Sequence, residues 1–232
     1  MAATEWIDRW DDGCQSDERR NELVLPYLAG KIRDRNPRTV LDIGCGSGYI
    51  SRILSRTFAD WVIDWILLDD KPDCVRYAVR GVELPARARE IVTDFREPLS
   101  SAIGADLAFV VFSLLEFPFT KQVAENLADC VTAGGDLVIV LPDVLEDLMA
   151  AQYQEINLLE QYVKGISCLQ KQDKFTGTPY NFFAPRVEEV IAMLTCPAFS
   201  LESLSFYGRA GKRILILDFV RRPAPLVTEH VR

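Results

Sequence analysis

The sequence has very little histidine, and its cysteines are not closely spaced. Of its 232 residues only His230, near the C-terminus, is a histidine, and the six cysteines are dispersed without a C-x-x-C pair. Zinc sites use closely spaced Cys and His residues, and disulfide frameworks are typical of short secreted chains that are dense in cysteine. We therefore expect neither a metal centre nor a disulfide scaffold. Any general base near a reactive site must then be a carboxylate or a tyrosinate.

Long apolar runs are also missing. No uncharged apolar run reaches the length of about 18 residues that a membrane helix needs. The first residues include Glu5, Asp8, Asp11 and Asp12, where a secretory signal would be basic and then apolar. We expect a cytoplasmic protein without membrane association. Hydrophobic residues make up 49% of the chain, enough to form the core of one α/β domain.

Basic residues are fewer than acidic residues. The chain has 26 Lys and Arg against 34 Asp and Glu, a net charge of −8. Binding to nucleic acid relies on clustered basic side chains that neutralise phosphates. The arginines at 76, 80, 87 and 89 are more typical of a solvated helix face than of such a patch. A nucleic-acid partner is therefore disfavoured.

The most informative feature that is present is a glycine loop. The apolar run Val40–Ile43, which contains Asp42, predicts a buried parallel strand, and glycines follow at 44, 46 and 48. Apolar residues then recur at helical spacing from Ile50, so the unit is strand, glycine loop and helix. Tyr49 replaces the glycine or alanine of a dinucleotide fingerprint, and no Lys-Ser or Lys-Thr follows to form a P-loop. Asp42 would repel phosphates and attract an ammonium group.

These residues resemble the first motif of the class I S-adenosylmethionine-dependent methyltransferases, acid-x-Gly-x-Gly-x-Gly. The run 66–69 resembles the second strand of that family, and Asp69 lies about 20 residues after the last glycine, as expected of a ribose-binding acid. Asp69 with Lys71-Pro72-Asp73 matches the family pattern acid-x-Ser-Pro-Glu in register. Asp70 competes for the same role.

The resemblance extends over about residues 37–142. Residues 91–95 resemble the third strand and its acid, which in the family meets the adenine amino group, and 106–116 and 133–140 resemble the fourth and fifth strands. The implied fold is α/β, a doubly wound, mostly parallel seven-stranded sheet with an antiparallel last strand. The implied cofactor is S-adenosyl-L-methionine. The residues that this resemblance assigns to cofactor binding are Asp42, Gly44, Cys45, Gly46, Gly48, Tyr49, Asp69, Asp70, Asp94, Phe95 and Phe112.

Segments outside the shared strands complete the predicted organisation. Residues 1–36 predict two helices, which the resemblance implies form an N-terminal helical lid; the alternative is that they only cover the edge of the sheet. Residues 37–222 form the cofactor-binding domain. Trp6 and Trp10 share one helix face, which is either core or lid. Residues 201–207 and 213–220 predict a hairpin that completes the sheet, and 223–232 form a loose tail.

An insertion at about 144–186 follows the fifth strand and is expected to cap the substrate pocket. Its first part, 144–164, has an apolar stripe that predicts one amphipathic helix. The stretch 174–186 is rich in aromatic and turn residues and predicts an aromatic pocket wall, or else a packed loop. In the family, small-molecule enzymes often have a histidine-bearing aromatic stretch here, and this chain resembles them without the histidine.

Candidate catalytic residues follow from the same positions. Glu116 stands where the family often has a Glu or His after the fourth strand, Asp143 follows the fifth strand, and Tyr180 lies in the aromatic stretch. We expect these three to line the acceptor pocket, with Glu116 the best candidate for a general base. Glu116 has an alternative role as a helix-capping residue.

The predicted function is methyl transfer to oxygen, nitrogen or carbon of a small, partly apolar molecule, for example one of specialised metabolism. The amino-group motif N/D-P-P-Y/F and the Pro-Cys pair of nucleic-acid methyltransferases are absent, since the chain has Phe112-Ser113-Leu114-Leu115 there. One alternative is an enzyme of the same fold that closes a ring within the cofactor and releases methylthioadenosine. Less favoured are an RNA or protein methyltransferase and a non-catalytic binding protein. A homodimer is left open.

Overall fold

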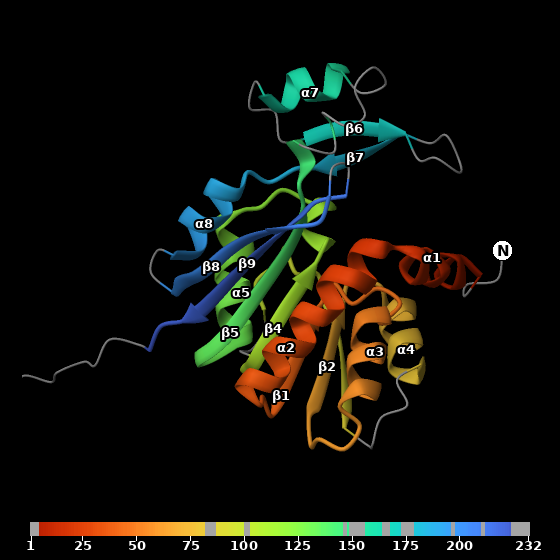
Figure 1. Cartoon of the computed structure of the whole chain (residues 1–232), viewed down its shortest axis with the longest axis vertical. Helices are drawn as coiled ribbons and strands as arrows, with labels where there is room; N and C mark the ends of the chain where they lie inside the picture. The colour runs from red at the N-terminus through yellow and green to blue at the C-terminus, as the bar shows by residue number, and fades with distance from the viewer. Residues whose placement is uncertain are drawn as a thin grey trace, which may run out of the picture.

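The fold is centred on one large sheet. The computed structural model describes residues 5–81, 87–99, 103–145, 148, 156–163, 168–172, 179–195, 198–209 and 212–223. Seven strands lie in the order β3-β2-β1-β4-β5-β9-β8 (Figure 1). Their bounds are β1 Thr39–Ile43, β2 Asp64–Asp69, β3 Ala88–Val92, β4 Ala105–Val111, β5 Val131–Pro142, β8 Phe199–Tyr207 and β9 Ile214–Arg221.

The strand directions confirm the predicted fold class. β1 pairs in parallel with β2 and β4, β2 with β3, and β4 with β5. β9, the last strand in the chain, is antiparallel to both of its neighbours, β5 and β8. The predicted C-terminal hairpin is therefore confirmed. The carboxyl ends of β1, β2 and β4 consequently meet at one edge of the sheet, where doubly wound folds bind ligands.

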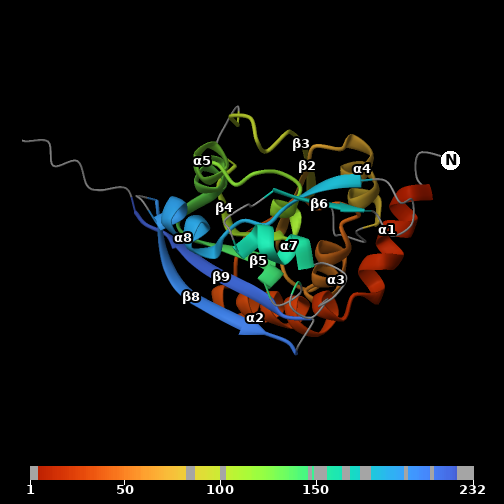
Figure 2. The same cartoon turned by 90° about the horizontal axis from the view of Figure 1, so that it is seen from above.

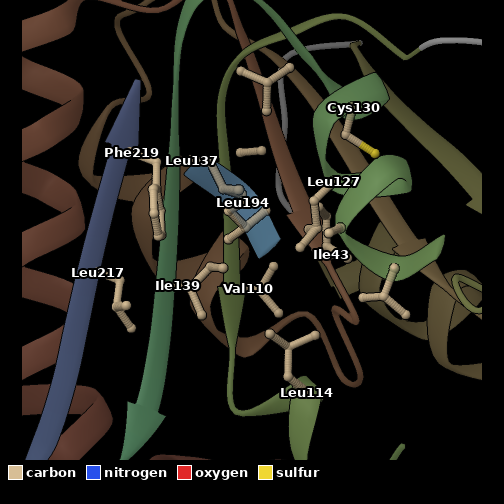
Figure 3. Close-up of a cluster of buried hydrophobic side chains, with 14 of the residues drawn as sticks. Ile43, Val110, Leu114, Leu127, Cys130, Leu137, Ile139, Leu194, Leu217 and Phe219 are labelled. Atoms are coloured by element: carbon tan, nitrogen blue, oxygen red, sulfur yellow. The ribbon is translucent and has the colours of Figure 1, made fainter. Parts of the chain in front are cut away.

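Helices cover both faces of the sheet. α5 (Lys121–Cys130) and α8 (Val187–Thr195) pack on one face, and α2 (Leu25–Arg35) and α3 (Tyr49–Thr57) on the other (Figure 2). α4 (Pro72–Gly81) packs on the face that α3 covers, through Val75 and Ala78. The strands are apolar along nearly their whole length because both of their faces are buried. Figure 3 shows side chains of β4, β5, β9 and α5 meeting in this core.

The N-terminal segment forms the two predicted helices, α1 (Glu5–Ser16) and α2, joined by a π-helical turn, η1 (Arg19–Val24). Buried ion pairs hold α2 against the sheet. Lys31 Nζ lies 2.5 Å from a carboxylate oxygen of Asp218 on β9 and 2.9 Å from one of Asp136 on β5. Since breaking a buried pair leaves an unpaired buried charge, these contacts fix the position of α2.

The insertion after β5 contains an element that the sequence analysis did not predict. β6 (Cys168–Gln172) and β7 (Pro179–Phe183) form a separate antiparallel pair, so the stretch 174–186 is partly a strand, where we expected a pocket wall or a loop. Alternating aromatic side chains favour such a strand. Within the predicted helix 144–164, α7 covers Ile156–Val163, whereas 146–147, 149–155 and 164 lie outside the described residues. α7, β6 and β7 lie beyond the carboxyl end of β4 (Figure 1).

Candidate cofactor site

A cavity of about 550 Å³ opens at the carboxyl ends of β1, β2 and β4. Its floor is the loop between β1 and α3, and its walls come from the segments that follow β2, β3 and β4. The N-terminal segment and β7 close its remaining sides through Trp10, Arg20, Asn181 and Phe182. This volume lies in the range of small-ligand pockets, roughly 300–1,000 Å³.

The glycine loop requires glycine for two different reasons. Gly44, Gly46 and Gly48 all have positive φ angles, of 68°, 53° and 72°, which side chains rarely tolerate. A Cβ at Gly44 would lie 2.3 Å from the hydroxyl of Ser113, and one at Gly48 would lie 2.5 Å from the Cβ of Ala78. The loop is therefore packed against the end of β4 on one side and against α4 on the other.

Asp42 is a buried carboxylate at the end of β1. Its side chain is 4% exposed, and Ser51 of α3 donates a hydrogen bond of 2.6 Å to its Oδ2. Burial raises the pKa of Asp42 to about 7, the Ser51 hydrogen bond acts to lower it, and the nearby Asp69 raises it further. An ionised carboxylate in this position is stabilised by a cation. Asp42 can thus recognise a positively charged group in the cavity.

Asp69 is the second buried carboxylate, at the end of β2. Its Oδ2 accepts a 3.0 Å hydrogen bond from the backbone N–H of Gly46, and its Oδ1 accepts one of 3.0 Å from the N–H of Lys71. Burial raises the pKa of Asp69, and these two N–H groups act to lower it. Because each carboxylate oxygen has two lone pairs, both oxygens can accept one further hydrogen bond.

Phe112, at the end of β4, has a strained backbone. Its φ of 63° places a bulky residue in the left-handed region, which costs about 1–3 kcal/mol. The guanidinium groups of Arg20 and Arg19 lie over its ring, 4.9 and 5.4 Å from the ring centre. Arg20 also pairs with Asp17 at 2.5 Å. The N-terminal segment is thereby attached to the wall of the cavity.

Two further contacts attach this segment to α3. The Nη2 of Arg52 lies 2.7 and 2.6 Å from the two carboxylate oxygens of Asp11, and the Tyr49 hydroxyl donates a 2.5 Å hydrogen bond to the side-chain oxygen of Asn21. Trp10, which directly precedes Asp11, packs over the loop: a Cβ at Gly46 would lie 3.3 Å from its ring. α1 therefore covers the glycine loop directly.

Charged side chains surround the mouth of the cavity. Lys71 Nζ lies 3.4 Å from Glu116 and 3.9 Å from Asp70, and it sits over the ring of Trp10. Arg96 contacts both carboxylate oxygens of Asp94 and lowers the pKa of Asp94. The lining includes five carboxylates, at 42, 69, 70, 94 and 116, but only three cations, at 20, 71 and 96. This excess favours a cationic ligand over a phosphate.

The structure brings together most of the residues assigned from the sequence. Among the assigned residues, those that line the cavity are Asp42, Gly44, Cys45, Gly46, Tyr49, Asp69, Asp70, Asp94, Phe95, Phe112 and Glu116. Gly48 does not line it and instead packs against Ala78. Asp143 lies elsewhere, in a second cavity, where Arg213 contacts it at 3.4 Å. Tyr180 lies in β7 opposite Lys171, next to the lining residues Asn181 and Phe182, and its side chain is outside the described part.

The sequence analysis did not identify several lining residues. Arg20 and Lys71 supply cations, Ser113 packs on Gly44, and Asn181 and Phe182 belong to β7. Lys71 occupies the Ser position of the acid-x-Ser-Pro-Glu pattern, a departure that could have indicated its place at the mouth. Within the described residues, no group of three or more His, Cys, Asp or Glu side chains is placed to hold a metal ion. In that same part of the chain, every helix is too short or too polar to span a membrane.

Comparison with known proteins supports the fold. No protein-family model and no curated protein matches the sequence. Among solved structures, the N-methyltransferase NodS from Bradyrhizobium japonicum, bound to S-adenosyl-L-homocysteine, is 18% identical with a TM-score of 0.60, covering 90% of this chain and 89% of NodS. The magnesium protoporphyrin IX methyltransferase ChlM from Synechocystis, with the same ligand bound, is 15% identical with a TM-score of 0.62, covering 89% and 86%.

A third structure extends the likeness to an archaeal protein. An S-adenosylmethionine-dependent methyltransferase from Methanosarcina mazei is 17% identical with a TM-score of 0.65, covering 84% of this chain and 98% of that one. Such low identities carry information about the fold and not about the acceptor. The chain has the class I fold of the S-adenosylmethionine-dependent methyltransferases.

Proposed function

We propose that the protein is an S-adenosylmethionine-dependent methyltransferase that acts on a small-molecule acceptor. One observation carries the proposal: Asp42 and Asp69, two buried carboxylates at neighbouring strand ends, face a glycine loop in a cavity rich in acids. S-adenosylmethionine combines an ammonium and a sulfonium with ribose hydroxyls and has no phosphate. The cavity therefore has the chemistry that this cofactor needs.

The individual residues fit this ligand. Asp69 has two free lone-pair positions for the ribose hydroxyls, and a carboxylate is a strong acceptor for such a pair. Asp42, whose pKa is raised by burial to about 7, is available to pair with the ammonium group. Gly44 and Gly46 carry no side chain that would exclude the ligand from the loop. When bound, the cofactor supplies an activated methyl group.

The remaining work of the protein is to align the acceptor and exclude water. Trp10 and the rest of α1 cover the glycine loop, which supports a lid role for residues 5–36. Glu116 lines the cavity mouth and is the candidate general base for an acceptor that must lose a proton. Tyr180 and Asp143 remain candidates for the acceptor pocket, on β7 and beyond β5 respectively.

A small-molecule acceptor is supported by charge. The net charge of −8 opposes binding to a polyanion. ChlM acts on magnesium protoporphyrin IX according to its description, which shows that this fold can accept a small molecule. The charge is therefore the ground on which we assign a small-molecule acceptor to this chain. The cytoplasmic location stays a prediction from the sequence.

The test separates binding from turnover. Isothermal titration calorimetry should show binding of S-adenosylmethionine and S-adenosylhomocysteine, with NAD⁺ and ATP as phosphate-bearing controls that do not bind. Incubation with S-adenosylmethionine and a small-molecule fraction of cell extract should yield S-adenosylhomocysteine only when the fraction is present. Formation of methylthioadenosine by protein and cofactor alone would instead support ring closure and contradict methyl transfer.

A further inference from the structure

A second cavity lies next to the proposed cofactor site. It has a volume of about 380 Å³ and is formed beyond the carboxyl end of β5, between α7, α8 and β8. Its lining residues are Leu115, Leu141, Pro142, Asp143, Val144, Leu145, Tyr162, Pro185, Val187, Glu188, Ile191, Leu204, Phe206 and Leu215. The volume is large enough for a small organic molecule.

The two cavities share a wall. Leu115, in the 3₁₀ turn η2 (Ser113–Leu115) after β4, lines both of them. The next residue, Glu116, lines the first cavity only. A molecule seated in the second cavity therefore lies one side chain away from the first. This continuity distinguishes the second cavity from an isolated surface hollow.

The second cavity is mainly apolar and partly exposed. Three of its lining residues are large apolar side chains with unusual exposure: Leu145 is 41% exposed, Leu204 is 38% exposed and Phe206 is 54% exposed. Leu204 and Phe206 are alternate residues of β8, so they project from the same face of the sheet. Exposed apolar side chains that gather around one hollow mark a binding surface.

The charged groups at this cavity select against an anion. Asp143 and Glu188 are its only ionisable carboxylates within the described residues, and each is paired with an arginine, Arg213 at 3.4 Å and Arg186 at 3.7 Å. Arg186 also donates a 3.0 Å hydrogen bond to the carbonyl oxygen of Tyr162. Arg213 also lies over the ring of the lining residue Phe206, 5.2 Å from the ring centre, so both arginines are already engaged by the lining. A ligand carboxylate or sulfonate would have to separate one of these ion pairs or be buried without a cation, which costs free energy.

We propose that the second cavity holds the apolar body of the methyl acceptor, an organic molecule without negative charge whose reacting atom extends past Leu115 into the first cavity. This inference rests on the proposed function. It places the apolar part of the acceptor, already predicted from the sequence, in a defined cavity, and it excludes a negative charge on that part. Apolar surface at Leu145, Leu204 and Phe206 is covered when that body binds, which supplies favourable free energy.

The test uses two matched fluorescent probes. N-phenyl-1-naphthylamine is apolar and uncharged, and 1-anilinonaphthalene-8-sulfonate has the same aromatic frame with a sulfonate added. The purified full chain should bind the uncharged probe at least about fivefold more tightly than the sulfonate, because the two arginines beside the cavity are already paired and the sulfonate would be buried without a cation. Binding of S-adenosylhomocysteine to the same protein preparation is measured separately by calorimetry.

Two variants locate the binding. Leu204→Glu places a charge in the cavity on an exposed strand position and should weaken binding of the uncharged probe by about tenfold or more. Met193→Glu is the matched control, because Met193 has the same 38% exposure and does not line the cavity. It should change the affinity by less than about twofold. Both variants should bind S-adenosylhomocysteine as the unmodified protein does.

The outcomes separate the two proposals. Equal probe binding by the unmodified protein and both variants, or no probe binding at all, would overturn the acceptor cavity even if S-adenosylhomocysteine binds. A homodimer in light scattering that Leu204→Glu separates would also overturn it, because β8 would then be an interface between copies. Failure of S-adenosylhomocysteine to bind, with probe discrimination intact, would overturn the proposed function instead.

Discussion

Asp69 Oδ2 accepts a 3.0 Å hydrogen bond from the backbone N–H of Gly46, so the end of β2 is bonded directly to the glycine loop that follows β1. The contact joins the carboxylate proposed to bind ribose to the loop that forms the cavity floor. It also has a structural consequence, because the loop conformation depends on the same side chain. Changes at Asp69 should therefore affect binding and the loop together.

The first prediction concerns this carboxylate. Asp69→Asn keeps the size of the side chain but removes its charge and one acceptor, and it should weaken S-adenosylhomocysteine binding by about 10- to 100-fold in calorimetry. Asp73→Asn is the control, since Asp73 is exposed, pairs with Arg76 and does not line the cavity. Equal affinity of the two variants would remove Asp69 from the ribose-binding role.

The second prediction is a pH dependence of cofactor binding. Since the pKa of Asp42 is raised to about 7, this carboxyl is largely protonated at about pH 6 and largely ionised at about pH 8. Only the ionised form pairs with an ammonium group, so affinity for S-adenosylmethionine should fall by about tenfold from pH 8 to pH 6. Asp42→Asn should bind more weakly at pH 8 and lose most of the dependence. A similar slope in that variant would assign the titration to another group.

The raised pKa of Asp42 has the opposite pH dependence in its effect on the stability of the protein without ligand. Because the pKa of Asp42 is higher in the folded chain than its usual value of 3.8, the folded state holds this proton more tightly than the unfolded state. The stabilising contribution is present at low pH and is lost as pH rises through about 7. Urea unfolding should therefore show that Asp42→Asn raises stability, relative to the unmodified protein, more at about pH 8 than at about pH 5.

The third prediction distinguishes Trp10 from Trp6. The two rings stack with centroids 5.9 Å apart, yet only Trp10 lines the cavity. Trp10→Ala should weaken S-adenosylhomocysteine binding by about 2- to 10-fold and reduce the change in tryptophan fluorescence on binding. Trp6→Ala should leave affinity within about twofold. If both variants bind as the unmodified protein does, α1 covers the loop without contacting the ligand.

Sequence reasoning could predict the position of a residue where that position depends on its own strand and loop. Asp42, Asp69, Gly44 and Gly46 line the cavity as expected because strand ends and a positive-φ loop leave a local pattern in the sequence. Trp10 could be placed on a helix face but not against Gly46, since that contact joins segments 36 residues apart in the chain. Asp143 follows β5 as predicted, yet it lines the second cavity, where it contacts Arg213.

The insertion at about 144–186 shows the same limit of sequence reasoning, which is that contacts between separate segments leave no local pattern. Its apolar stripe and aromatic residues indicated packing, but β6 and β7 are separated by six residues, and the turn residues between them do not include the Asn-Gly or Asp-Gly pair that marks a tight hairpin. Arg20 and Lys71 were missed because a cation on a helix or after a strand is usually solvated. Only the three-dimensional arrangement brings Arg20 onto Phe112 and Lys71 onto Glu116.

The fourth prediction concerns the candidate base. Glu116→Gln should lower turnover by about 10²- to 10⁴-fold with any acceptor that must be deprotonated, while S-adenosylhomocysteine affinity stays within about threefold. Glu125→Gln is the control, because Glu125 is an exposed residue of α5 paired with Lys121. Full turnover by Glu116→Gln would show that the acceptor needs no base at this position.

The fifth prediction tests why Gly48 is glycine although it does not line the cavity. Gly48→Ala combines a φ of 72° with a Cβ placed 2.5 Å from the Cβ of Ala78, so both backbone strain and overlap should destabilise the fold. We expect a loss of about 2–4 kcal/mol in the free energy of unfolding, measured with urea. In Gly48→Ala with Ala78→Gly the overlap between the two Cβ atoms is removed, while the backbone strain and a 2.9 Å approach to the Cα of residue 78 stay. The double variant should therefore be more stable than the sum of the single changes predicts, by about 1–2 kcal/mol. Simple additivity would show that the overlap between the two Cβ atoms does not contribute to the requirement for glycine at this position.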